Sequence, residues 1–460
     1  MKSERKTRSK QVSPYLLVIL SFVGVILLGS FLLSLPFAHR DGQWGNYMDA
    51  LFHATSATCV TGLSTYSLGI GGELTFFGQI VMLVMIQIGG LGFITILTFF
   101  VSLIQKKIQF KDRYMLAQAV NSTSIADVGK FVRRVIIIVV TAETLGFALG
   151  LPVFLNVPGY TVSKAIWASV FTSISAFNNA GFDIFGGTSL IQGMGTIVDT
   201  MPQWAYYYMQ GYIMILIVMG GLSFLTIIEL TFQRKKAKQL SSFTRITLLM
   251  TGSLIIFGFG VLMLTDGISG NITPYQALFQ SVTTRTAGFA SFDQSTLSPA
   301  GKTVSCVLMF IGGSPISTAG GIKTTTIFVL ILCFVRFLQG RKISAFKREF
   351  TNSSIIKTMT LVFLSVVVLL VGYVCIASFE RGNNAATTDA VLYETFSAFG
   401  TVGLSENLTI TLSLGSKIVI CILMFFGRLG PITLFQIFQK NIDNEKNTHY
   451  REVPTDVIIG

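Results

Sequence analysis

Long hydrophobic runs alternate with short polar connections along the 460-residue chain. Most runs have the length that an α-helix needs to cross about 30 Å of hydrocarbon, and the longer runs imply tilted helices. The pattern therefore predicts a single membrane domain, residues 1–460, with eight membrane-spanning helices. The predicted spans are Tyr15–Leu35, Phe77–Ile104, Val135–Val157, Ala205–Thr231, Thr247–Thr265, Val304–Val335, Thr358–Phe379 and Ile418–Phe438.

The composition agrees with a chain that lies in a lipid membrane. Only 12% of the residues are charged, 51% are hydrophobic, and the mean hydropathy is +0.67. A soluble globular protein carries about 25% charged residues, and a disordered chain has low hydropathy, so both classes are excluded. The net charge of +13 does not indicate nucleic acid as a partner, because a nucleic-acid-binding protein shows its basic clusters on a soluble fold.

The positive charge instead predicts the orientation of the chain. Most of the 34 Lys and Arg residues lie in the N-terminal segment, in the connections after even-numbered spans, and in the tail. The positive-inside rule makes this side cytoplasmic. We therefore expect a multi-pass protein of the cell membrane with both termini in the cytoplasm. Lys323 and Arg428 are exceptions, since both fall inside hydrophobic runs.

The four connections after odd-numbered spans resemble one another. Each holds a short, semi-apolar segment that ends in a glycine, at residues 50–62, 169–181, 279–288 and 392–403. The spans that follow carry related glycine-rich stretches, at residues 88–95, 219–226, 311–318 and 426–433. We therefore expect an all-α fold of four tandem helix–pore-loop–helix units, with eight membrane-spanning helices and four short pore helices around one pseudo-fourfold pore. The units are predicted at residues 14–105, 128–233, 242–338 and 352–440, and residues 441–460 form a cytoplasmic tail.

Each of these segments is too short to span the membrane, so we expect it to re-enter from the outside. Irregular backbone is tolerated at membrane depth where it is buried in protein or lines a water-filled cavity. Thr273 can cap such a short helix, with Pro274 at its first position. A helix that enters from the outside points its C-terminus inward, and this end carries about half a negative charge. Four such ends around one axis favour a cation.

The residues before the four glycines share no ligand side chain, and glycine can adopt positive φ. This favours a ring of main-chain carbonyls, which replaces the hydration shell of an ion as in potassium filters. The simpler alternative is that the glycines only allow close helix packing. The predicted ion-binding residues are Cys59, Val60, Thr61, Gly62, Asn178, Asn179, Ala180, Gly181, Arg285, Thr286, Ala287, Gly288, Gly400, Thr401, Val402 and Gly403.

Two of the spans that follow the short segments, the sixth and the eighth, contain unusual residues. The stretch from Gly312 to Lys323 is rich in glycine and contains Pro315, so a helix cannot continue well through it, although a simple kink would also explain it. Arg428 takes the place of a glycine in the other units, and a charge within a span is costly and usually functional. In the simpler alternative, Arg428 binds backbone carbonyls and fixes the last helix.

With these motifs the sequence resembles the Ktr/Trk/HKT superfamily of potassium transporters, and within it the KtrB-type membrane subunit. The resemblance covers nearly the whole chain, and implies channel-like K⁺ uptake through a selectivity filter. In HKT relatives a serine at the first filter glycine accompanies sodium permeation, so Gly62 supports potassium. Trk-type members generally carry an additional N-terminal helix pair, and the start of this chain favours the Ktr type. The most specific parts of the resemblance are Thr58–Gly62, Asn178–Gly181, Thr284–Gly288, Gly400–Gly403 and Arg428.

The resemblance also implies a gate and partners. It implies a flexible loop that gates the pore under the filter, with Arg428 projecting into the pore as an electrostatic barrier and Lys323 anchoring the loop. A homodimer is implied, together with a cytoplasmic nucleotide-binding ring of RCK-type, KtrA-like subunits. No organic cofactor is expected in this chain, and sodium dependence is left open. The predicted gate residues are Gly312, Gly313, Ser314, Pro315, Ile316, Ser317, Thr318, Ala319, Gly320, Gly321, Lys323 and Arg428.

Two other classes of protein compete with a channel-like transporter. A secondary active cation symporter with alternating access usually shows two related halves, whereas four units are found here. An intramembrane enzyme would need a nucleophile with a base, or paired carboxylates. His53 near Ser56 suggests such a pair, but its equivalents Thr172 and Gln280 do not repeat it. We therefore expect no catalytic residues and no enzyme.

Overall fold

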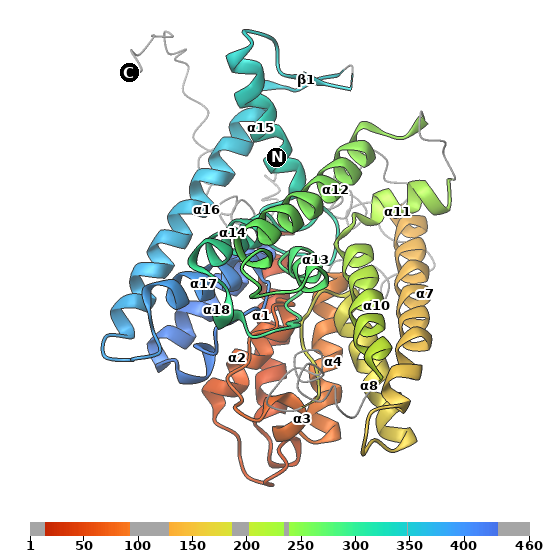
Figure 1. The fold of residues 1–460 in the computed structure, drawn as a ribbon, viewed down its shortest axis with the longest axis vertical. Coiled ribbons are helices and arrows are strands. Elements are labelled where there is room, and N and C mark those ends of the chain that lie inside the picture. The colour runs from red at the N-terminus through yellow and green to blue at the C-terminus, as the bar shows by residue number, and fades with distance from the viewer. Residues whose placement is uncertain (1–13, 93–127, 186–201, 234–238, 347, 431–460) are drawn as a thin grey trace, which may run out of the picture.

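The computed structural model describes residues 14–92, 128–185, 202–233, 239–346 and 348–430. Within these ranges the chain is mostly helical (Figure 1). A two-residue hairpin departs from the predicted all-α fold, because Ser344–Ala345 (β1) pairs antiparallel with Arg348–Glu349 (β2). The predicted tail, residues 441–460, and the ends of the second and eighth predicted spans lie outside the described residues.

The longer helices correspond to the predicted hydrophobic spans. Among the described residues, Gly129–Leu155, Ser242–Gly267 and Asn352–Phe379 are long and apolar enough to cross a membrane unaided. The hairpin and α15 (Thr324–Leu338) project at one end of the molecule, and the short helix α3 (Gly69–Glu73) lies at the opposite end (Figure 1). The helices that lie in the predicted spans are α1 (Pro14–Ser34), α4 (Phe76–Leu91), α7 (Val128–Leu155), α10 (Gln203–Gly221), α11 (Phe224–Thr231), α12 (Ser242–Leu262), α14 (Pro299–Phe310), α15 (Thr324–Leu338), α16 (Asn352–Phe379) and α18 (Leu414–Leu429).

Four short helices occupy the predicted re-entrant segments, and their sequences explain where they begin. Each follows an Asn or Thr whose side chain accepts a hydrogen bond from the first turn, which satisfies a backbone donor that the helix leaves free. Thr273 forms a capping box with Gln276, and Pro274 occupies the first turn, as predicted. The four helices are α2 (Tyr47–Thr58), α8 (Val162–Phe177), α13 (Pro274–Thr283) and α17 (Thr388–Gly400).

Buried carboxylates join the later outer helices to the inner helices. Asp266, in the π-helical turn Met263–Gly267 (η4) after α12, is fully buried and accepts hydrogen bonds from the Ser298 backbone N–H (2.7 Å) and hydroxyl (3.1 Å). Glu380, after α16, accepts from the Ser413 backbone N–H at 2.8 Å. Ser298 and Ser413 are the N-caps of α14 and α18. These contacts therefore fix the points at which α14 and α18 begin.

Two of the predicted spans are broken. The break predicted at the glycine-rich stretch is present, since α14 ends at Phe310 and α15 begins at Thr324. The prediction of one continuous helix from Ala205 to Thr231 was wrong, because α10 and α11 meet at an angle of 101°. The loop between α14 and α15 supplies the bonds at this bend. The Phe224 N–H donates to the Ile316 carbonyl (2.9 Å), and the Gly221 carbonyl accepts from the Ser314 N–H (3.1 Å).

Candidate functional site

The loops that follow the four short helices share one backbone conformation. In each loop the glycine has positive φ, and so does the residue two positions before it. Positive φ is uncommon for non-glycine residues, so its recurrence at four unrelated side chains indicates that the backbone is the shared element. The non-glycine residues are Val60 (58°), Asn179 (59°), Thr286 (70°) and Thr401 (51°), and the glycines are Gly62 (103°), Gly181 (69°), Gly288 (79°) and Gly403 (94°).

The four glycines form a closed ring. In each loop, the residue just before the glycine carries a carbonyl group that faces the glycine of a neighbouring loop. A Cβ atom added to any of the four glycines would lie less than 3.0 Å from the oxygen of such a carbonyl. The structure therefore leaves no room for a side chain at these positions, and it brings backbone from all four predicted filter segments together. The carbonyls that would be met belong to Ala180 for Gly62, Ala287 for Gly181, Val402 for Gly288, and Thr61 for Gly403.

A buried hydroxyl group forms a hydrogen bond to the backbone of each loop, at or just after the glycine. These hydroxyl groups were not among the residues predicted from the sequence. Ser56 and Ser175 donate to the carbonyls of Leu63 (2.9 Å) and Phe182 (2.7 Å), the residues just after the glycines. Their equivalents, Thr283 and Ser397, bond to the Phe289 carbonyl (2.7 Å) and the Gly403 N–H (3.0 Å). The available signal was a Ser or Thr at a nearly constant distance before each glycine.

Side chains three positions before the glycines contact the surrounding helices. The Asn178 amide donates to Glu143 of α7 (3.1 Å) and to Gln87 of α4 (3.0 Å). The Arg285 guanidinium is 6% exposed and donates to the Thr251 carbonyl of α12 at 3.3 Å. Cys59 is fully buried, and Gly400 has no side chain. At this position the Asn178 and Arg285 side chains therefore turn toward the surrounding helices.

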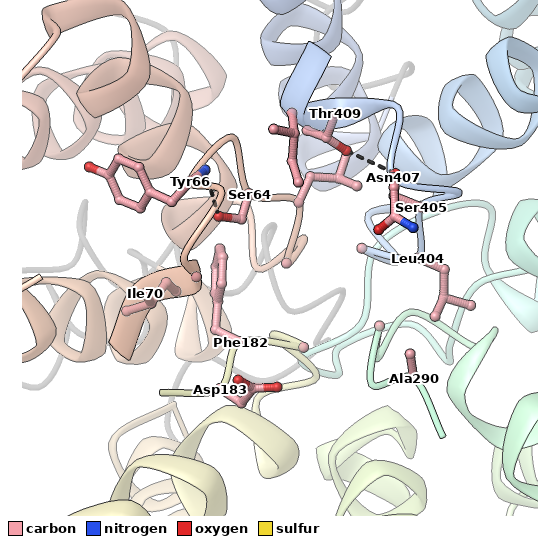
Figure 2. Close-up of a pocket in the computed structure, with 17 residues that line it drawn as sticks. Ser64, Tyr66, Ile70, Phe182, Asp183, Ala290, Leu404, Ser405, Asn407 and Thr409 are labelled. Carbon is pink, nitrogen blue, oxygen red and sulfur yellow. Dashed lines mark hydrogen bonds between the residues drawn. The ribbon is translucent and has the colours of Figure 1, made fainter. Parts of the chain in front are cut away.

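A pocket of about 180 Å³ opens on one side of the ring, and all four glycines line it (Figure 2). We call it the vestibule. Asp183 brings a carboxylate to its wall, and Tyr66 and Phe182 bring aromatic rings. His53 lies behind Tyr66, with ring centroids 3.7 Å apart, and bonds to Ser64 Oγ (2.9 Å). These contacts explain His53 as a buried polar residue beside the loops.

The predicted gate lies directly against the ring. The Thr318 hydroxyl donates to the carbonyls of Gly220 (2.9 Å) and Phe177 (3.3 Å), the last residue of α8. The Gly321 N–H donates to the Gly427 carbonyl of α18 at 3.2 Å. A Cβ on Gly320 would collide with the Thr401 side chain. The loop between α14 and α15 therefore contacts two of the four glycine loops or their helices.

The two basic residues that fall inside predicted spans, Lys323 and Arg428, both bind carbonyl groups around this gate loop. The Arg428 guanidinium donates to the carbonyls of Thr318, Gly89 and Gly90, the last at 3.2 Å. Arg428 thus links α18 to the gate loop and to the end of α4. The Lys323 ammonium group donates to the Ala319 carbonyl at 2.6 Å, inside the loop that it was predicted to anchor.

Comparison with known proteins identifies the family. The family model of TrkH, described as a cation transport protein, matches residues 2–450. The potassium/sodium uptake protein NtpJ of Enterococcus hirae is 34% identical over 457 residues, which cover 97% of this chain and 98% of that protein. Ktr system potassium uptake protein B of Bacillus subtilis is 33% identical, with 95% of each chain covered. The chain belongs to the TrkH family of cation transport proteins.

The solved structure of the potassium transporter TrkH from Vibrio parahaemolyticus has the same fold, with a TM-score of 0.69 and 18% identity. The match covers 94% of this chain and 86% of that one. The predicted family resemblance is therefore confirmed. The chain is a mostly helical, multi-pass membrane transporter and not an enzyme.

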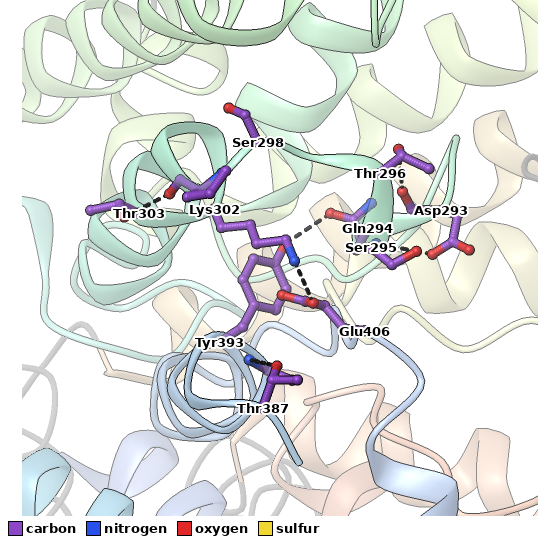
Figure 3. A network of polar contacts seen from close by, with 12 residues as sticks. Asp293, Gln294, Ser295, Thr296, Ser298, Lys302, Thr303, Thr387, Tyr393 and Glu406 are labelled. Atoms are coloured by element: carbon purple, nitrogen blue, oxygen red, sulfur yellow. Dashed lines mark hydrogen bonds and ion pairs between the residues drawn. The ribbon is translucent and has the colours of Figure 1, made fainter. Parts of the chain in front are cut away.

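In this TrkH-family transporter, side chains at one equivalent position join neighbouring segments around the ring. The position lies four residues after the N-cap of α4, α10, α14 and α18. The side chains of α4 and α10 contact the next short helix along the chain, α8 and α13. The side chain of α14 contacts the loop after α17, and that of α18 contacts α2, the first short helix. Figure 3 shows one of these pairs, Lys302 with Glu406. The pairs are Gln79 with Trp167 (2.7 Å), Tyr206 with Gln276 (3.1 Å), Lys302 with Glu406 (2.6 Å) and Lys417 with Asp49 (2.6 Å).

We predict that reversing one charge of the Lys417–Asp49 pair lowers the free energy of unfolding of the protein. The pair is largely buried, with side chains 15% and 22% exposed, so Lys417→Asp should cost about 2 kcal/mol. The double variant Lys417→Asp/Asp49→Lys should recover most of this loss in a thermal-unfolding measurement on purified protein. Reversing the exposed Lys342–Glu349 pair (3.7 Å) is the control and should have no effect. Equal loss in the single and double variants would contradict the prediction.

Proposed function

We propose that this chain is the pore-forming membrane subunit of a Ktr-type potassium uptake system, and that K⁺ passes through a carbonyl filter at the glycine ring. The observation that carries the proposal is the closed contact among Gly62, Gly181, Gly288 and Gly403, in loops with a common positive-φ backbone. Each loop follows the C-terminus of a short helix, where about half a negative charge favours a cation. Carbonyls around such an axis can replace the hydration shell of K⁺.

The proposed filter comprises the sixteen residues predicted from sequence, acting mainly through their backbone. The printed names of the relatives support the ion, since they describe potassium uptake and, in one case, potassium and sodium uptake. Gly62, at the position where a serine accompanies sodium permeation in HKT relatives, also favours potassium. Four tandem units around a pseudo-fourfold axis account for the equivalent loops. The vestibule is then the extracellular mouth, and both termini lie in the cytoplasm.

We propose that the loop between α14 and α15 gates this pore. Its contacts with Phe177, Thr401 and Gly427 support this role, because a shift of a loop that touches the ring would change access to the filter. Arg428 acts on this gate in two ways. Its charge opposes cations, and its bonds hold Thr318 against the end of α4. Partners are a second copy of this chain and a cytoplasmic nucleotide-binding ring of RCK type.

We predict that Arg428→Ala raises the basal potassium flux several-fold, because the gate loop loses its link to α4 and the pore loses a positive charge. Arg428→Lys should have a smaller effect, since lysine keeps the charge but cannot reproduce the fork of donors. The measurement is the initial rate of Rb⁺ uptake into liposomes. Arg341→Ala, at an exposed arginine beside the hairpin, is the control. An unaltered flux in Arg428→Ala would return the residue to a purely structural role.

The decisive experiment for the proposed function measures K⁺ and Na⁺ flux in liposomes that contain only the purified chain. Channel-like conduction predicts K⁺ flux that follows its electrochemical gradient at any ratio to Na⁺. A fixed ratio of Na⁺ to K⁺ movement, with uphill transport of one ion, would instead support the alternative, a secondary active cation symporter with alternating access. Addition of a nucleotide-binding regulatory subunit then tests the proposed partner.

A further inference from the structure

Helix α7 carries one carboxylate in the middle of an otherwise apolar stretch. Glu143 is the only charged residue between Val135 and Leu155, and it lies nine residues after Arg134. At 1.5 Å per helical residue, it is about 14 Å along the helix from the last basic side chain, near the middle of a hydrocarbon layer about 30 Å thick. An ionisable residue at this depth is costly and usually functional. Glu143 is therefore a candidate for a role in transport.

The packing of a long helix on a short one does not require this carboxylate. The Ser173 hydroxyl of α8 donates to the main-chain carbonyl of Glu143 on α7 at 2.6 Å. In the corresponding contact, the Ser281 hydroxyl of α13 donates to the main-chain carbonyl of Ile255 on α12 at 2.8 Å. Ile255 is thus the equivalent of Glu143, and an aliphatic side chain serves there. The carboxylate has a partner that is specific to the second glycine loop.

That partner is Asn178, which is fully buried at the end of α8. Its amide nitrogen Nδ2 donates to Oε1 of Glu143 on α7 at 3.1 Å and to Oε1 of Gln87 on α4 at 3.0 Å. The same nitrogen lies 2.9 Å from the Ile174 carbonyl of its own helix. The amide is therefore held between two helices, α7 and α4. We call Asn178, Glu143 and Gln87 the Asn178 clamp.

The Asn178 clamp acts on backbone that forms the glycine ring. Asn178 directly precedes Asn179, whose φ is +59°, and the carbonyl of Ala180 faces Gly62 across the ring. On its other side, Oδ1 of Asn178 packs so closely against Gly90 of α4 that an added Cβ atom would collide with it. The loop cannot shift toward α4, and the clamp opposes a shift away from it. The position of the Asn178 amide therefore determines where the Ala180 carbonyl lies.

We propose that Glu143 is a positioning residue for the second glycine loop and that it contributes to the choice between K⁺ and Na⁺. Together with Gln87 it holds the Asn178 amide, and so keeps the Ala180 carbonyl in its place in the ring. A carbonyl filter discriminates by the size of its cavity or by the number and field strength of its carbonyls, and both change when a loop moves. The clamp stands on its own geometry. Its effect on ion choice rests on the proposed function, because it assumes that K⁺ passes through this ring.

The test of ion choice is the ratio of Na⁺ to Rb⁺ influx into liposomes that contain the purified full chain. Glu143→Leu removes the acceptor but keeps an apolar side chain that suits a membrane span. It should raise the ratio about fivefold, which corresponds to about 1 kcal/mol of lost discrimination. Glu143→Gln keeps an acceptor oxygen for Asn178 and should keep a ratio close to that of the wild type.

A purely structural role would not change this ratio, because a loss of folded protein lowers both fluxes together. Thr144→Ala, at the exposed neighbouring residue of α7, is the control and should leave the ratio unchanged. A wild-type ratio in Glu143→Leu overturns the proposal. If Glu143→Leu does not fold, Gln87→Leu removes the other acceptor in its place, and an unchanged ratio there overturns the proposal.

The competing explanation is a direct attraction between the Glu143 charge and the passing ion. Glu143→Gln and Glu143→Leu both remove that charge, so a direct attraction predicts equal changes in transport for the two variants. Equal changes overturn the proposal. A change in Glu143→Leu that is largely restored in Glu143→Gln supports it, because only the hydrogen bond to Asn178 distinguishes the two variants.

A double-mutant cycle with Asn178→Ala tests whether Glu143 acts through Asn178. Glu143→Leu should add little to the ion ratio of Asn178→Ala, and additive changes would overturn the proposal. The same cycle in thermal unfolding tests the contact without transport, since the double variant should lose less stability than the sum of the single variants. Coupled unfolding in a chain that conducts no Rb⁺ would overturn the proposed function and leave the clamp standing. Selective Rb⁺ flux with uncoupled variants would overturn the clamp and leave the proposed function standing.

Discussion

Gly288→Ser is expected to abolish potassium uptake or to remove its selectivity over sodium. Gly288 has φ of +79°, and a Cβ atom there would collide with the Val402 carbonyl, one of the groups proposed to hold the ion. Serine must therefore either displace that carbonyl or change the backbone of its own loop. A distortion that raises the barrier by about 3 kcal/mol lowers the flux about 100-fold. The measurement is Rb⁺ and Na⁺ flux into liposomes at equal protein content.

The chain offers a matched control for this substitution. Gly270 has φ of +80°, nearly the same as Gly288, but a Cβ atom there would meet nothing within 4 Å. Gly270→Ser thus carries the same backbone strain without the contact at the ring, and it should transport at close to the wild-type rate. Unchanged apparent affinity and ion preference in Gly288→Ser would contradict a filter at this ring.

Deletion of residues 312–321 is expected to raise the flux in the closed state at least tenfold. The segment lies against the ring through Thr318 and Gly320, and its removal takes away the proposed barrier under the filter. A tenfold rise corresponds to a barrier lower by about 1.4 kcal/mol. The measurement is Rb⁺ uptake with and without a nucleotide-binding regulatory subunit, whose control should also be lost in the deletion variant.

A milder variant guards against misfolding after the deletion, because the segment also bonds to the bend between α10 and α11. Thr318→Val keeps the loop but removes the hydroxyl bonds to Phe177 and Gly220, and it should give an intermediate flux. A properly folded deletion variant with normal basal flux and normal regulation would rule out the gate at this loop.

Much of the fold and of the candidate site could be predicted from local patterns. Hydrophobic runs mark the long helices because a bilayer requires apolar, hydrogen-bonded segments of a minimum length. Thr273 and Pro274 mark the start of a short helix because capping depends on neighbouring residues. The glycines of the ring were found from their recurrence. All four have positive φ, the backbone conformation that glycine adopts more readily than other residues.

The bend between α10 and α11 shows why other features escaped prediction. Gly89-Gly90 and Gly220-Gly221 look alike in sequence, and both pairs lie in the last turn of a helix. Only the second pair is followed directly by a sharp bend into another described helix. The bend depends on bonds from Ser314 and Ile316, which come from another part of the chain. A local pattern contains no information about such partners.

The sequence by itself therefore determined the membrane class, the long helices, the four glycine loops, and the break before α15, since each depends on composition or on neighbouring residues. Tertiary structure decided how these parts meet. It closed the glycines into a ring, turned Asn178 and Arg285 toward the surrounding helices, and gave Arg428 its three carbonyl partners. The reason is physical, because these contacts join residues that are far apart in the chain and come together only after the helices pack.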